Sequence, residues 1–78
     1  MIKSKQAEVL ACETVKTYLK SCDCKTPQEV ANVLMMLTSV CGLCTLQHVG
    51  KDEAVARLRG TANFVAKHRL KRKKGAIH

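Results

Sequence analysis

The five cysteines are the residues of this sequence best suited to chemistry, because thiolates bind soft metals and attack electrophiles. One residue separates Cys22 from Cys24, and two separate Cys41 from Cys44. Four such ligands suit a structural zinc ion, and the two-residue spacing also suits a redox dithiol. In the third interpretation, cysteine packs as a small apolar residue in a helical interface. We favour this third interpretation and expect neither a metal nor another cofactor.

Helix geometry argues against one ion shared by all four thiols. If one helix runs from Pro27 through Cys41, the fourteen residue steps between them rise by about 21 Å. A zinc–sulfur bond is only about 2.3 Å long. A shared site would therefore require a break in the helix near Gly42, or ligands from a second chain.

No other group of residues predicts catalysis. Cys44 and His48 are one helical turn apart, which allows a thiolate–imidazole pair, but the sequence identifies no residue to orient the histidine. The six acids offer no pair placed for acid–base work, and the four glycines do not form a phosphate-binding loop. We predict that the protein is not an enzyme.

Positive charge is concentrated at the C-terminal end. The net charge is +8, and residues 51–78 carry nine Lys or Arg against two acids. Arg57 and Arg59 precede a run of six basic residues in eight positions. A basic residue that neutralises a phosphate releases counterions, so we predict that all eight contact nucleic acid. The six in the run are Lys67, Arg69, Lys71, Arg72, Lys73 and Lys74.

Other interpretations of this basic end stay open. An acidic protein surface would attract the same charges, and such a run can also serve only solubility. Phe64 lies on the side of its helix that carries Arg57, Gly60 and His68. We expect Phe64 to pack against the first helix or against a second subunit. The alternative is an exposed ring that meets a base, a groove or a partner protein.

The elements that position these residues are predicted to be helices. Apolar residues recur at spacings of three and four over about 4–22, as on one face of a helix. A second helix is predicted over about 27–48, because its start signal is clear. Thr26 can cap this helix, Pro27 suits its first position, and Glu29 completes a capping box.

The third helix is predicted over about 52–70. Gly50 favours a stop before it, and Asp52 and Glu53 suit a first helical turn. Its expected core-facing residues are Val55, Leu58, Ala62 and Val65.

The middle helix is apolar on nearly its whole circumference, and no Asp, Glu, Lys or Arg occurs from Val30 to Gly50. Two neighbouring helices in one short chain would not cover it. We therefore predict an all-α fold, in which a small antiparallel three-helix unit forms a homodimer around this helix. Residues 1–66 would form the helical core, and 67–78 a basic segment continuing the third helix. The expected dimer contacts are Val33, Leu34, Met36, Leu37, Val40 and Leu43.

The same uncharged stretch is long enough to cross a bilayer. Several polar residues interrupt it, and no aromatic residue lies at either end to anchor it. We expect a soluble protein without membrane contact. The N-terminus lacks the apolar stretch of a secretory signal, so we also expect a cytoplasmic location with reduced thiols.

Two functions follow as hypotheses. The first is a small helical nucleic-acid-binding protein, a regulator or accessory factor of a DNA transaction, that contacts phosphates through its basic C-terminal segment. The alternative is a non-enzymatic module that docks on a larger protein or complex as an inhibitor or adaptor. Phages and mobile elements often encode proteins of that second kind.

Overall fold

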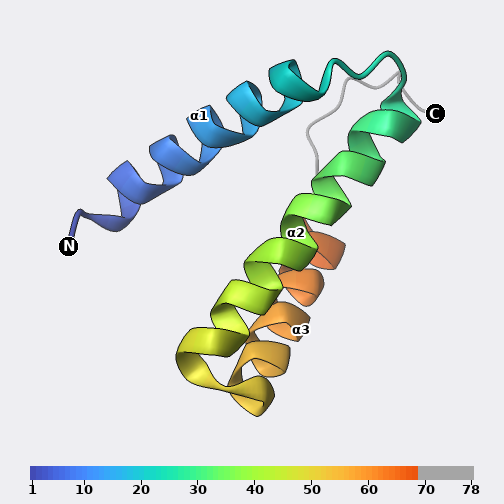
Figure 1. Ribbon diagram of the computed structural model, residues 1–78. Helices are drawn as coiled ribbons and strands as arrows, with labels where there is room; N and C mark the ends of the chain where they lie inside the picture. The colour runs from blue at the N-terminus through green and yellow to red at the C-terminus, as the bar shows by residue number, and fades with distance from the viewer. Residues whose placement is uncertain (69–78) are drawn as a thin grey trace. The chain divides into compact units, whose positions relative to one another are not determined.

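The protein is all-α, as the sequence predicts (Figure 1). The computed structural model describes residues 1–68. In this range α1 comprises Ser4–Cys22, α2 comprises Pro27–Val49 and α3 comprises Lys51–Lys67, and there is no strand. Each helix begins within one residue of its predicted start.

The chain divides within α2 into two units, Met1–Cys41 and Gly42–His78. In the first unit, the Tyr18 hydroxyl of α1 donates a 2.7 Å hydrogen bond to the backbone carbonyl of Val33 in α2. Several apolar side chains of these two helices are half-buried. They are Val15 and Leu19 of α1, with Val30, Val33, Leu34 and Leu37 of α2.

The corner between α1 and α2 is fixed by local hydrogen bonds. Asp23 adopts the left-handed conformation at φ 54°, and its N–H donates to the Leu19 carbonyl at 3.1 Å. The Thr26 hydroxyl accepts from the Glu29 N–H at 3.1 Å, which confirms the predicted cap. The Glu29 carboxylate in turn accepts from the Lys25 N–H at 2.7 Å, one residue before the expected donor.

Small residues allow close packing between α2 and α3 in the second unit. Gly42 and Ala54 are the buried residues of the described range, and Ala54 is 2% exposed. A Cβ atom added at Gly42 would lie 3.2 Å from Cδ1 of Leu58, so the glycine permits this contact. Gly50 has φ 88° and ψ 166°, a conformation essentially restricted to glycine, and it ends α2 as predicted.

The third helix ends earlier than the sequence predicts. α3 stops at Lys67, and His68 is extended, with φ −71° and ψ 128°. The expected end at about Leu70 lies outside the described residues.

By length and composition, α2 could cross a membrane. The core helix of a soluble protein and a signal sequence meet the same criteria, so this property is weak evidence. In contrast with a typical core helix, 6% of the most apolar part of α2 is buried within the protein.

Candidate functional site

An exposed apolar stripe runs along α2. Met36, Val40 and Leu43 follow one another at spacings of four and three, so they share one side of this continuous helix. Their side chains are between 57% and 62% exposed. We call these three residues the α2 stripe.

The structure separates the six predicted dimer residues into two groups. Val33, Leu34 and Leu37 are half-buried, so other parts of the chain already cover part of their surface. The α2 stripe is exposed and available to a partner. The predicted dimer contact is therefore limited to the α2 stripe, because the other three residues are already partly covered within the chain.

The face of α3 that carries Phe64 is built from residues one helical turn apart. We call Arg57, Gly60, Phe64 and His68 the α3 outer face. The Phe64 and His68 ring centroids are 5.8 Å apart, with the ring planes tilted by 37°. Phe64 is 67% exposed in the single chain, and its expected packing on a second subunit stays a prediction. The alternative interpretation, an exposed ring on a basic helix, matches this geometry.

The predicted phosphate-contacting residues do not share one face. Arg57 and Arg59 are two residues apart, so they point about 200° apart around α3. The Arg57 Nε donates to the Glu53 carboxylate at 2.8 Å, which offsets part of its charge. Lys67 is exposed in the last turn of α3. The other five predicted contacts lie outside the described residues: Arg69, Lys71, Arg72, Lys73 and Lys74.

The cysteines do not form a recognisable metal centre within residues 1–68. This range contains no group of three or more His, Cys, Asp or Glu side chains placed to hold an ion. α2 continues through Gly42 without a break, so that condition for a zinc site shared by Cys22, Cys24, Cys41 and Cys44 is not met.

Two groups near the α1–α2 corner have altered acidity. Desolvation raises the pKa of the Cys24 thiol, and the neighbouring Cys22, Glu29 and Asp23 raise it further. Desolvation also raises the pKa of Tyr18, with a further contribution from Cys22. A raised pKa means less thiolate at neutral pH, so this corner is a poor place for a nucleophile.

The possible pair of Cys44 and His48 takes a different form from a catalytic pair. His48 Nδ1 lies 2.8 Å from the backbone carbonyl oxygen of Cys44. A carbonyl only accepts hydrogen bonds, so Nδ1 is the donor in this contact. The ring nitrogen nearest to Cys44 therefore binds backbone, and it cannot also take a proton from the thiol.

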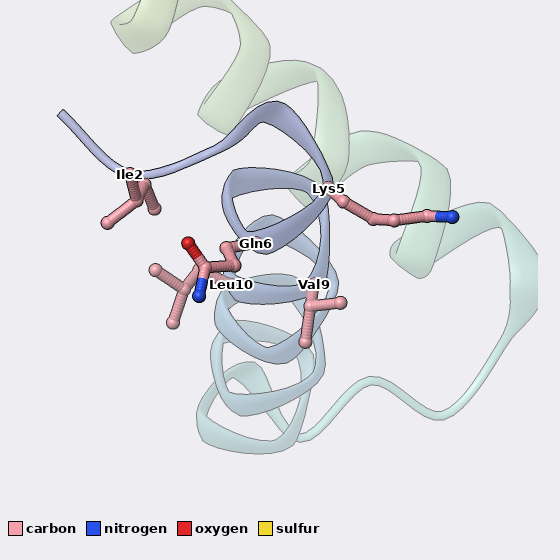
Figure 2. A pocket seen from close by; sticks show the side chains of 5 residues that line it. All are labelled: Ile2, Lys5, Gln6, Val9 and Leu10. Carbon is pink, nitrogen blue, oxygen red and sulfur yellow. The ribbon is translucent and has the colours of Figure 1, made fainter.

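The start of α1 carries an exposed apolar surface, which includes Val9 and Leu10. Figure 2 shows Ile2, Gln6 and Leu10 on one side of the chain, with Lys5 and Val9 on another. Ile2, Val9 and Leu10 are all exposed. The spacing of four between Gln6 and Leu10 predicts that they share a face of the helix. Their exposure depends on contacts with other helices, which this spacing does not predict.

Gly42 and Ala54 are structural residues that sequence reasoning missed. Neither is bulky enough to mark a hydrophobic seam, yet both are buried. A usable signal was available in Gly42, because a glycine inside an otherwise apolar helix favours close approach by a neighbouring group.

No family model matches this chain, and no curated protein or solved structure is significantly similar to it.

Proposed function

We propose that this chain is a small, non-enzymatic, dimeric helical protein that contacts nucleic acid through its basic C-terminal segment. The observation that carries the proposal is the placement of charge. Six of the eight residues from 67 to 74 are basic, and without this run the net charge falls from +8 to +2. A localised run suits a phosphate backbone better than an evenly spread charge does. In this proposal the protein is cytoplasmic and regulates or assists a DNA transaction.

The α2 stripe supports the dimer in this proposal. A second copy would cover Met36, Val40 and Leu43 without placing like charges together, because α2 has no Asp, Glu, Lys or Arg after Glu29. The same uncharged surface could instead lie in a bilayer. The polar residues Asn32 and Gln47 flank the stripe and favour a protein partner. The sharp corner at Gly50 supports an antiparallel course of the helices that it joins.

The test is nucleic-acid binding by the full chain across a range of salt concentrations. In one variant, all six basic residues from Lys67 to Lys74 are replaced by Gln. If each contacts one phosphate of a duplex, the slope of log K against log salt becomes shallower by about 5. The matched control replaces the five lysines of residues 1–50 by Gln, which removes similar charge elsewhere. Equal slopes for the two variants would contradict the proposal.

Light scattering tests the oligomeric state independently. A dimer mass in solution without detergent is expected. A stable monomer at high concentration would contradict the dimer, and recovery of the protein only with membranes would contradict its solubility.

A second function has its own observation. The apolar surface at the start of α1 leaves Ile2, Val9 and Leu10 exposed, which suits docking on a larger protein as an inhibitor or adaptor. Replacing Val9 and Leu10 by Ser should abolish a specific protein complex under this alternative, while salt-dependent nucleic-acid binding should persist under the first.

A further inference from the structure

Phe64 lies in an unusual chemical setting on α3. It is the single phenylalanine of the chain and is 67% exposed. An exposed apolar residue alone is common and needs no explanation. Here, however, the ring lies one turn from His68, with 5.8 Å between ring centroids, so two flat rings are adjacent on one face.

Gly60 supplies an independent observation one turn before Phe64. A Cβ atom added there would meet nothing within 4 Å, so no contact among residues 1–68 requires this glycine. Gly42 differs, because the Leu58 side chain approaches it closely. Glycine inside a helix is less favourable than alanine, so Gly60 has an energetic cost without a packing reason in the described range. It leaves open space at the turn over which the Phe64 side chain leans.

The charges around this face identify the chemistry of an occupant. Arg57 lies on the same side of α3, and Lys67 follows Phe64 by three residues at the start of the basic run. Carboxylates on an acidic protein would pair with the cations, but they would gain nothing from an open ring. A nucleotide complements both features, because its base has a flat π-face and its phosphate is anionic.

The base must be unpaired to reach the ring. Bases within a duplex are stacked on one another, and single-stranded regions expose their faces to aromatic side chains. Either single-stranded DNA or single-stranded RNA offers this chemistry.

We propose that the α3 outer face binds an unpaired nucleotide, with Phe64 stacking on the base and Lys67 contacting a flanking phosphate. Gly60 leaves room for the base to approach the helix. This inference rests on the proposed nucleic-acid function, and it names single-stranded nucleic acid as the ligand class.

The experiment measures binding of the full chain to fluorescent dT15, U15 and a 15-base-pair duplex by anisotropy. Phe64→Leu should weaken single-strand binding by about 10-fold, since one stacked base contributes roughly a 5- to 150-fold effect. Its salt slope and its duplex binding should match those of the unchanged protein. Gly60→Ala should raise the melting temperature yet weaken single-strand binding several-fold. The ratio of dT15 to U15 affinity distinguishes DNA from RNA as the source.

A second variant keeps the proposal falsifiable if Phe64→Leu does not fold. The chain has no tryptophan, so Phe64→Trp introduces a single tryptophan, whose emission can be excited apart from that of Tyr18, and retains a stacking ring. Its fluorescence should be quenched on binding dT15, and its affinity should equal or exceed that of the unchanged protein. Unquenched fluorescence at saturating dT15 would overturn the stacking proposal.

The two proposals fail in different ways. If Phe64→Leu binds dT15 as tightly as the unchanged protein, while substitution of the basic run removes binding, the stacking proposal is wrong and the proposed function stands. If the unchanged protein binds none of the three ligands in a salt-dependent manner, the proposed function is wrong, and the stacking proposal fails with it.

Discussion

α2 and α3 are consecutive in the chain, yet they present opposite chemistry to solvent. α2 exposes Met36, Val40 and Leu43, and it has no charged side chain after Glu29. α3 exposes a ring and cations, and it leads into the basic run. The two surfaces lie on separate helices.

This separation has a physical reason in the proposed dimer. Two copies of a chain of net charge +8 repel each other, so the surface on which they meet must be uncharged. A surface that attracts phosphates needs the opposite composition. One short chain can therefore carry both an uncharged surface and a basic surface if they lie on different helices.

The largest expected effect comes from placing a charge in the α2 stripe. Val40→Asp would bury a carboxylate in the proposed dimer, and we expect association to weaken by at least about 100-fold, or 2.7 kcal/mol. Ala31→Asp is the matched control. Ala31 lies nine residues earlier, which is two and a half turns, and therefore on the opposite side of the helix. Sedimentation analysis measures both variants, and equal association of the two would remove the stripe from the interface.

The two helix glycines provide the second test, because one is enclosed and the other is open. Gly42→Val introduces a side chain against Leu58, and we expect a loss of about 1–3 kcal/mol of stability. Gly60→Ala adds a methyl group in open space, and we expect a gain of about 1 kcal/mol from helix propensity. Thermal unfolding followed by circular dichroism at equal protein concentration gives both values. Shifts of the same sign would contradict the contrast between the two sites.

The start of α2 gives a smaller effect. Thr26→Ala removes the hydroxyl that accepts from the Glu29 N–H, and we expect a cost of about 1 kcal/mol. Thr26→Ser keeps the hydroxyl, so it should unfold close to the temperature of the unchanged protein. If serine and alanine destabilise equally, the hydrogen bond is not what fixes this end of α2.

The smallest expected effect concerns thiol reactivity. Cys24 is half-buried, and its pKa is raised by desolvation, so less of it is thiolate at pH 7.5. Iodoacetamide should therefore modify Cys24 several-fold more slowly than the exposed Cys44, and the Cys24 rate should keep rising as the pH is raised further. Mass spectrometry of quenched samples measures the rates, and in urea the two rates should converge.

The helices could be predicted because their signals are local. Thr26, Pro27 and Glu29 mark a helix start whatever lies around them, and Gly50 marks an end because its positive φ favours glycine. The end of α3 was predicted less well. The basic residues after Lys67 suit a helix C-terminus individually, but together they repel one another.

Contacts between helices could not be predicted in the same way, since they depend on which faces meet. Val65 belongs to the predicted seam of α3 yet is 63% exposed, while Ala54 beside that seam is buried. The Tyr18 bond to the Val33 carbonyl joins residues fifteen positions apart, and no local pattern encodes it. Phe64 is expected to pack because its side chain is apolar. Hydrophobicity alone, however, does not reveal which other residues a side chain contacts.

The shallow interior of residues 1–68, where Gly42 and Ala54 are the buried residues, has a consequence for how the protein persists in a cell. In a dimer with so little interior per subunit, folding and pairing become one equilibrium governed by mass action. Each tenfold dilution then costs the folded dimer about 1.4 kcal/mol. In the proposed dimer the folded fraction would therefore rise and fall with the amount of protein synthesised, so expression level itself would control how much of the proposed nucleic-acid-binding form is present.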